Sequence, residues 1–156
     1  MPRDFQCLQK FVEPIPLLNE YKKQERIVFT VEEIAELIIE GINQIELKGK
    51  DPAQFEKLSD QIISSDPDVI CYILGSFYGL ESKMANAAFE AAATGHLVII
   101  QMDQPSCEDA VNFLKRNVKY PVEQLEELIV GVCCQKLIEV DGKIKAVYDF
   151  KNLLES

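Results

Sequence analysis

The sequence lacks any apolar stretch long enough to cross a membrane. Its apolar runs, such as Val69–Leu74, are far shorter than the roughly 20 residues that a membrane-spanning helix needs. The first residues also lack the basic segment followed by an apolar one that forms a secretory signal. We therefore expect a cytoplasmic protein that is not membrane-spanning and that reaches the inner membrane, if at all, only peripherally through a partner.

Positive charge is scarce as well. Lys and Arg number 16 against 26 Asp and Glu, which gives a net charge of -10. Most of the surface should therefore repel a phosphate backbone. This charge balance argues against nucleic acid as a partner.

Metal-binding patterns are missing too. The chain has one histidine, and its five cysteines contain no Cys-x-x-Cys pair, so their spacing offers no tetrahedral zinc site. Cys133 and Cys134 are adjacent, and in a strand they would point to opposite faces. Asp66 and Asp68 bracket a proline, which is more typical of a turn than of a ligand pair. We expect reduced thiols, no metal and no cofactor.

What is present fits one domain behind an N-terminal arm. A chain of 156 residues that is 47% hydrophobic can form a single globular domain with a sizeable core. Residues 1–25 carry two prolines and then a polar run, without a sustained helical or strand period. They are predicted to form an arm, either a strap on the chain's own core, which we favour, or a second contact surface. Residues 26–156 are predicted to form the domain.

Apolar patterning beyond residue 25 predicts strands that alternate with helices. The expected strands cover residues 27–29, 69–74 and 97–102, the expected helices cover 31–45, 52–63, 82–94, 106–117 and 122–129, and a hairpin joins 132–140 to 143–150. Thr30 is expected to cap the first of these helices, with Glu33 at the capping-box position. The order predicts an α/β fold with a mainly parallel central sheet, helices on both faces, and the hairpin around Asp141-Gly142 closing the sheet at its end.

Several stretches of the second half resemble the motor ATPases of type IV pili and type II secretion. In chain order they are Asp66–Ile70, similar to the opening of the family's Walker B strand; Leu80–Ser82, similar to the Leu-Glu-Thr after it; Ala91–Val98, similar to the start of its histidine box; and Ser106–Val118 and Leu125–Leu137, similar to the helices and strand that follow. The resemblance covers about 75 to 85 residues in one collinear order, which is more specific than a lone short motif. The resemblance implies a three-layer α/β/α RecA-like (P-loop NTPase-like) core.

The parts of that family that handle phosphate are not recognisable in this sequence. No Gly-x-x-x-x-Gly-Lys-Ser/Thr string exists, and Gly49-Lys50 is followed by Asp51. Val28–Thr30, with the helix expected after it, resembles a P-loop strand and helix whose loop is missing. The catalytic glutamate of the family aligns with Ser76, or with Leu74 in the other register, so neither register leaves a carboxylate there.

The remaining motif positions are interpreted as remnants rather than as a working site. They are Asp68, Ser76, Glu81, His96 and Asp103. The second histidine of the family's histidine box falls at Asp103, an anion where transferred phosphate would be repelled. Without a phosphate cradle, we expect His96 to have a structural role and Glu81 a surface or capping role. No catalytic, cofactor-binding or metal-binding residue is assigned.

Three functions remain open. The first is a non-catalytic pseudo-ATPase that regulates or assembles a type IV pilus or type II secretion-like machinery by binding a protein partner, such as an intact motor ATPase or a platform protein. The second is an enzyme, in particular a nucleotide-binding or hydrolysing subunit completed in trans by another chain. The third is a scaffold that self-associates. We expect a monomer or small homo-oligomer, because the resemblance lacks the N-terminal domain through which the family's hexameric rings close.

Overall fold

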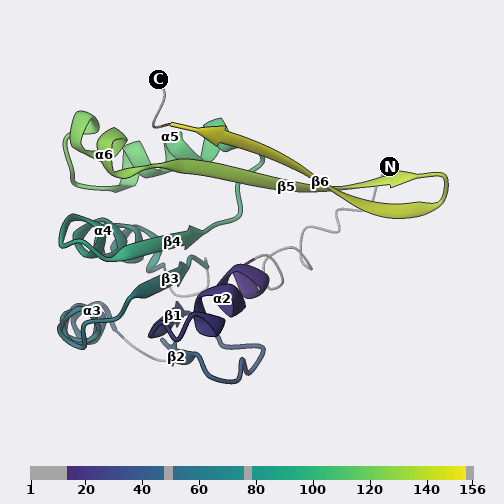
Figure 1. The fold of residues 1–156 in the computed structure, drawn as a ribbon. Helices are drawn as coiled ribbons and strands as arrows, with labels where there is room; N and C mark the ends of the chain where they lie inside the picture. Colours follow the sequence, from purple (N-terminus) through teal and green to yellow (C-terminus); the bar gives the residue numbers. More distant parts are fainter. Residues whose placement is uncertain (1–13, 48–50, 76–78, 154–156) are drawn as a thin grey trace.

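The computed structural model describes residues 14–47, 51–75 and 79–153 (Figure 1). The helices are α2 (Pro14–Lys23), α3 (Pro52–Ser64), α4 (Glu81–Ala93), α5 (Cys107–Asn117) and α6 (Val122–Leu128), and the strands are β1 (Val28–Glu32), β2 (Asn43–Glu46), β3 (Val69–Ile73), β4 (Leu97–Gln101), β5 (Gly131–Val140) and β6 (Lys143–Asn152). None of the helices in these described ranges is long and apolar enough to cross a membrane.

Four strands form a parallel sheet in the order β2-β1-β3-β4. β3 lies between β1 and β4, and four of its five residues are buried, as its continuous apolar run indicates for a central strand. The apolar run Leu97–Ile100 indicates a buried strand as well, and here β4 forms and pairs with β3 but is not buried. Leu97 is exposed and the next three residues are only half-buried, because β4 is the edge strand of the described sheet.

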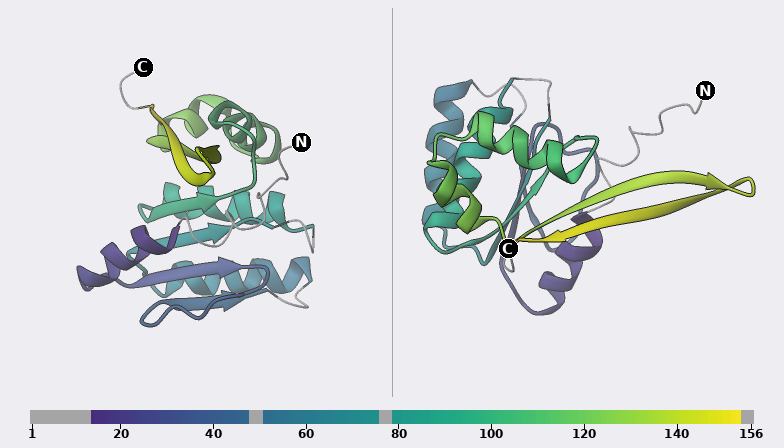
Figure 2. Two further views of the ribbon diagram at one scale, coloured as in Figure 1. Left: turned by 90° about the vertical axis from the view of Figure 1, so that its right-hand side faces the viewer. Right: turned by 90° about the horizontal axis from the view of Figure 1, so that it is seen from above.

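Helices cover both faces of this sheet, as expected (Figure 1 and Figure 2). On one face Leu18 of α2 packs with Val69 and Cys71 of β3. On the other face Ile70 and Tyr72 of β3 belong to a larger core that also includes α3 and α4. Alternate side chains of one strand point to opposite faces, so β3 contributes to both layers. The α/β/α layering is confirmed.

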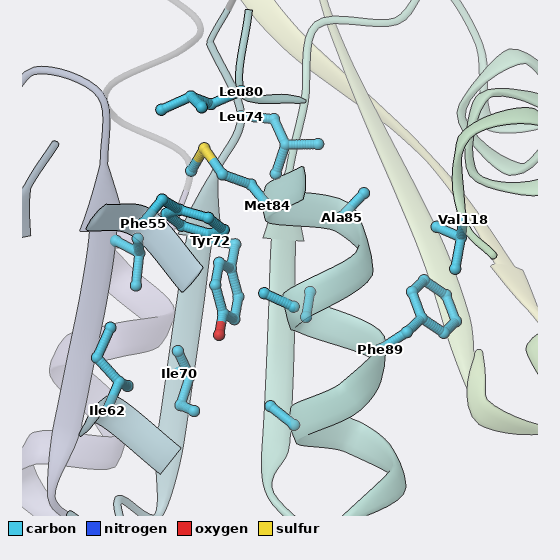
Figure 3. Close-up of a cluster of buried hydrophobic side chains, with 14 of the residues drawn as sticks. Phe55, Ile62, Ile70, Tyr72, Leu74, Leu80, Met84, Ala85, Phe89 and Val118 are labelled. Carbon is cyan, nitrogen blue, oxygen red and sulfur yellow. The ribbon is translucent and has the colours of Figure 1, made fainter. Parts of the chain in front are cut away.

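The larger core is centred on an aromatic ring of β3. Figure 3 shows Tyr72 between Phe55 and Ile62 of α3 and Met84 of α4. All four side chains are at most 2% exposed. Burying a side chain of this size stabilises the fold by about 1.5–3 kcal/mol. This contact fixes both helices against the sheet.

The segment 31–45, predicted to be a helix, is not one. β1 continues to Glu32, an irregular loop follows, and the chain then enters β2. Ile38 is 97% exposed, so the apparent apolar face of that helix is not buried. Gln44 satisfies the loop backbone instead, because its Oε1 accepts from Ile39 N at 2.6 Å and its Nε2 donates to Leu37 O at 2.7 Å.

Two further predictions depended on that helix and are also wrong. Thr30 is a strand residue rather than a helix cap, and its Oγ1 donates to Glu32 Oε1. The interpretation of Val28–Thr30 as a P-loop strand followed by its helix is also wrong, because β1 runs into a loop. The reason is that isoleucine-rich segments suit strands as well as helices, so spacing alone does not decide between them.

A helix instead occurs within residues 1–25, where no period was recognised. The prolines of α2 lie in its first turn, where a backbone N–H has no helical partner to lose. Lys22 and Lys23 lie in its last turn, where positive charge interacts favourably with the helix dipole. Leu18 is fully buried against β1 and β3. This part of the predicted arm therefore lies on the chain's own core, while residues 1–13 lie outside the described residues.

The C-terminal hairpin is confirmed, but it does not close the central sheet. β5 and β6 form a separate antiparallel sheet that projects away from the rest of the fold (Figure 2). Asp141 and Gly142 join the strands with φ values of 53° and 72°, the left-handed values that a tight hairpin turn requires. Its base is attached to α5, where the Cys107 thiol donates to Asp149 O at 3.5 Å.

Candidate functional site

The candidate site is the edge of the central sheet at which the parallel strands end. In open α/β sheets, ligands bind outside the carboxyl ends of the strands. Here β1 ends at Glu32, β3 at Ile73 and β4 at Gln101, and these three residues form one row across the sheet. We call this the carboxyl edge.

Glu32 is the buried charged group of this row. Glu32 is only 4% exposed. Its Oε1 accepts from Thr30 Oγ1 at 2.5 Å and from Gln44 Nε2 at 3.0 Å. A buried carboxylate is costly unless it is hydrogen-bonded. Gln44 also bonds the loop, so one amide connects β1, β2 and the segment between them.

Glu33 follows directly and is also 4% exposed. It packs against the backbone that leaves β3: a Cβ added to Gly75 would lie 2.6 Å from Glu33 Oε2. Gly75 therefore leaves the space that the Glu33 carboxylate fills. The ends of β1 and β3 are closed over by this contact.

The side chains at the carboxyl edge carry carboxylate and amide oxygens, which accept hydrogen bonds. Its described residues at the ends of β1 and β4 include Glu32, Glu33, Gln101 and Asp103, and neither Lys nor Arg is found among residues 32–35, 73–75 and 101–104. Asp103 is exposed. An anionic edge of this kind repels phosphate groups.

Sequence reasoning missed Glu32, Glu33 and Gln44. A signal was available, since Thr-Val-Glu-Glu places acidic residues at the end of an apolar strand, where sites in α/β sheets are found. The helix predicted over 31–45 concealed this signal, because it used Glu33 as a capping residue.

The structure separates the five remnant positions. Asp68 precedes β3 and His96 precedes β4, so both lie at the amino edge of the sheet. Glu81 begins α4 and Asp103 follows β4, so both lie toward the carboxyl edge. A five-residue strand spans about 17 Å, which keeps the two pairs apart. Ser76 lies outside the described residues.

Asp68 holds two chain segments together at the amino edge. Its Oδ2 accepts from Ile27 N at 2.7 Å and its Oδ1 from Arg26 Nη1 at 3.0 Å. The Ile27 amide, and next the Arg26 guanidinium, hold the pKa of the Asp68 carboxyl below its usual value. These bonds fix the entry to β1 against the turn before β3.

His96 binds the end of a helix. Its Nδ1 lies 3.1 Å from Ala91 O and 3.0 Å from Thr94 Oγ1. Ala91 O only accepts, so Nδ1 carries the proton in that bond. The imidazole therefore adds a side-chain bond to a carbonyl at the end of α4 that already accepts from the backbone N–H groups of Thr94 and His96.

The described cysteines are free thiols. Across the part of the chain that the structure describes, no group of three or more His, Cys, Asp or Glu side chains is placed to hold a metal ion. Burial raises the pKa of the Cys71 thiol to about 12. Burial and the neighbouring Cys107 thiol raise that of Cys134 to about 12, whereas Cys133 is exposed. The two adjacent cysteines thus have different surroundings.

Comparison with known proteins identifies the family. The sequence model described as "Type II/IV secretion system protein" matches residues 14–152. The chain is 32% identical to the type II secretion system protein E of Xanthomonas campestris over 123 residues and 33% identical to the type II secretion system protein HxcR of Pseudomonas aeruginosa over 131 residues. The type II secretion system ATPase E of Vibrio cholerae is 31% identical over 121 residues.

These relatives are much longer than the matched segment. The matches cover 78%, 77% and 78% of this chain but only 20%, 26% and 23% of the three relatives. The chain therefore spans about a quarter or less of the length of the curated relatives it matches.

Solved structures agree on the fold. The chain is similar to the ATPase DotB of Legionella pneumophila, with a TM-score of 0.63 and 23% identity over 82% of this chain and 37% of that one. It is also similar to the VirB11 ATPase of the Brucella suis type IV secretion system, with a TM-score of 0.64 and 18% identity over 90% and 45%. The family match covers most of the chain, and the fold agrees with it. The chain belongs to the type II/IV secretion system protein family.

Proposed function

We propose that this chain is a non-catalytic pseudo-ATPase that works by binding another protein. The partner is an intact motor ATPase or a platform protein of a type II secretion or type IV pilus machinery, and the complex forms in the cytoplasm next to the inner membrane. The observation that carries this proposal is that these 156 residues contain no Gly-x-x-x-x-Gly-Lys-Ser/Thr string, the pattern that forms a phosphate-binding loop.

The carboxyl edge supports the same proposal. Hydrolysis of a nucleoside triphosphate needs cationic groups and Mg²⁺ around the transferred phosphate. The ends of β1 and β4 offer Glu32, Glu33 and Asp103 instead, and Glu33 fills the space beside Gly75. This arrangement disfavours a bound phosphate at the place where the fold would hold one.

The hairpin supports a binding role. Ile144, Tyr148 and Phe150 of β6 alternate along the strand and therefore share one face, and they are 57%, 63% and 66% exposed. Large exposed apolar side chains gathered on one face are characteristic of interaction surfaces. The net charge of -10 favours a partner with a basic patch through electrostatic steering, so binding should weaken as salt is raised.

A second candidate is a nucleotide-binding subunit completed in trans by another chain. One observation favours it: Glu32 is held buried by Thr30 and Gln44 at the carboxyl edge. Retaining a buried carboxylate is costly, so such groups are often functional. In this case a partner would supply the phosphate-binding loop.

The deciding experiment is a pull-down of the tagged full chain from native lysate with quantitative mass spectrometry. We expect enrichment of a secretion or pilus motor ATPase or platform protein, reduced at high salt and lost in the double variant Tyr148→Ser, Phe150→Ser. The matched control is Ile38→Ser, which removes an apolar side chain that is even more exposed, at 97%, outside the hairpin. Recovery of a stable hexamer of this chain alone, at low and high salt, would contradict the proposal. Hydrolysis of ATP only after the partner is added would favour the second candidate.

A further inference from the structure

The C-terminal hairpin is a sheet of two strands whose distal part projects beyond the rest of the fold (Figure 2). α5 packs at its base, where the Cys107 thiol donates to Asp149 O. All ten residues of β6 are exposed, and within the described residues no third strand continues the sheet. A two-stranded sheet by itself is only marginally stable in water, and a third strand on an apolar face normally adds the stability it lacks. The free side of β6 is where such a strand can be added.

The outer edge of β6 carries the backbone groups of alternate residues. Leu153 N donates to Val130 O at 3.1 Å, so the backbone of Leu153 faces β5. In an antiparallel pair, every second residue of a strand bonds its neighbour. The odd-numbered residues of β6 therefore face β5, and the N–H and C=O groups of the even-numbered residues from Ile144 to Phe150 point outward. An edge with unpaired backbone groups is a template for pairing with another strand.

The charges of β6 are complementary to a second copy of the same strand. Antiparallel pairing centred on Val147 places Lys145 of each copy opposite Asp149 of the other. Opposite charges directly across two strands stabilise a sheet, whereas like charges in that position destabilise it. Within the hairpin the residues directly opposite are uncharged, because Lys145 faces Ile138 and Asp149 faces Cys134. The second copy therefore supplies both charges with an oppositely charged neighbour across the strands.

The same alignment matches the apolar residues of β6. Ile144 lies opposite Phe150 of the other copy, and Ala146 lies opposite Tyr148. These even-numbered residues share the face of the strand that is turned away from the two charges. Aromatic side chains opposite β-branched ones stabilise paired strands. Their backbone groups are the ones that point outward, so the same residues form the hydrogen bonds of the new pair.

We propose that β6 binds a second copy of this chain edge to edge, as an antiparallel pair over residues 144–150, so that two hairpins form one sheet in the order β5-β6-β6-β5. The two-fold axis passes through Val147. The pairing ends where Lys143 would face Lys151, because like charges repel there. The bodies of the two copies lie at opposite ends of the shared sheet, since the strands are antiparallel. The inference does not rest on the proposed function, because edge pairing leaves the apolar face of β6 open to another partner.

Analytical ultracentrifugation of the full chain between micromolar and millimolar concentrations tests the pairing. We expect a monomer–dimer equilibrium. Lys145→Asp should raise its dissociation constant at least about tenfold, because both Lys–Asp pairs become repulsive. Lys145→Asp combined with Asp149→Lys should restore dimerisation, because the exchange rebuilds both pairs. The matched control is Lys136→Asp, the same change of charge on β5, which should alter the constant by less than about twofold. A monomer at every concentration, or a dimer that Lys145→Asp leaves unchanged, would overturn the proposal.

Cross-linking tests the register. Val147→Cys brings two thiols together at the two-fold axis, in a non-hydrogen-bonded pair whose Cα atoms are about 4.5 Å apart, which a disulfide can span. Lys145→Cys is the matched control, because its two copies lie four strand positions, or about 14 Å, apart. Both variants carry Cys7→Ser and Cys133→Ser, and the second of these removes an exposed native thiol. With oxidised glutathione as the oxidant, we expect a covalent dimer of the Val147→Cys protein alone on a non-reducing gel. Equal cross-linking of the two variants, or none in either, would contradict the pairing.

Discussion

Gly75 and Glu33 are packed so closely that a Cβ on Gly75 would lie 2.6 Å from Glu33 Oε2. The contact joins the ends of β1 and β3, the place where an α/β sheet normally offers its ligand site. Because Glu33 is buried, the side chain cannot swing into solvent without uncovering the end of the sheet. In this protein the carboxyl edge is closed by its own acidic residue.

This contact predicts coupling between the two positions. Gly75→Ala should destabilise the protein by about 1–2 kcal/mol, since an added methyl group forces the buried carboxylate to move. In a Glu33→Ala background the cost should fall by at least about 0.5 kcal/mol. Urea unfolding of the four proteins measures the difference. Glu123→Ala on α6 is the control background, in which Gly75→Ala should cost as much as in the native chain.

Asp68 predicts a specific acid dependence of stability. Bonds from Ile27 N and Arg26 hold the folded pKa of this carboxyl below its usual value. A lowered folded pKa contributes stability that is present above the unfolded pKa of about 3.9 and is lost as pH falls through the folded pKa. Asp68→Asn should therefore lower stability near neutral pH and flatten the acid branch. Urea unfolding between pH 3 and pH 7 measures the stability of both proteins. The control is Asp66→Asn, which changes an exposed carboxyl two residues away. Parallel acid branches for the native protein and Asp68→Asn would contradict it.

His96 predicts a stability effect rather than a catalytic one. His96→Ala removes the bond from Nδ1 to Ala91 O at the end of α4, which should cost about 1 kcal/mol. Thermal unfolding followed by circular dichroism measures the cost. His96→Asn, whose amide can still reach the last turn, should recover part of it. Unchanged stability in His96→Ala would show that the bond is not formed in solution.

The thiols should differ in reactivity by position. Only thiolates react with alkylating reagents, and burial raises the pKa of Cys71 and of Cys134 to about 12. Exposed Cys133 should be labelled by iodoacetamide at pH 8 well before either of them, as read by peptide mass mapping. Labelling in urea is the control, because all sites should then react at similar rates. Rapid labelling of Cys71 in the native protein would show that its surroundings open.

Nucleotide should leave the isolated chain unchanged. A ligand that binds only the folded state stabilises it by about 2.7 kcal/mol at a hundredfold excess over Kd. We therefore expect neither a thermal shift at millimolar Mg-ATP nor phosphate release from the purified protein. Urea unfolding with Mg²⁺ but without ATP separates the effect of the ion on stability from that of the nucleotide. A shift of several degrees that disappears in Glu32→Gln would instead favour the nucleotide-binding candidate.

Much of the fold could be predicted from the sequence, because several elements carry their own local signals. The helix at 107–117 has Ser106 as its N-cap, acidic residues in its first turn and basic residues in its last, and it forms where expected. Asp141-Gly142 specifies the hairpin turn through its backbone preference. Val69–Ile73 is apolar throughout and is the buried central strand.

The candidate site could not be predicted in the same way. Glu32 and Gln44 are twelve residues apart, and their bond depends on the parallel pairing of β1 with β2. The spacing of Ile34, Ile38 and Ile42 suits a helix, but Ile42 is buried while Ile38 is 97% exposed, so the three do not share one buried face, and the strand and loop prevail. Helical periodicity stabilises a helix only when packing buries the apolar side.

The sequence by itself determined the family, the alternation of strands and helices after residue 50, and the hairpin, because each depends on residues close together in the chain. Only the tertiary structure decided that 14–23 is a helix on the core, that 33–42 is a loop, that β4 is an edge strand and that the hairpin stands apart from the sheet. These outcomes depend on which apolar faces find a partner. Leu18 is buried because β1 and β3 lie beneath it, whereas Ile38 is exposed because nothing covers it.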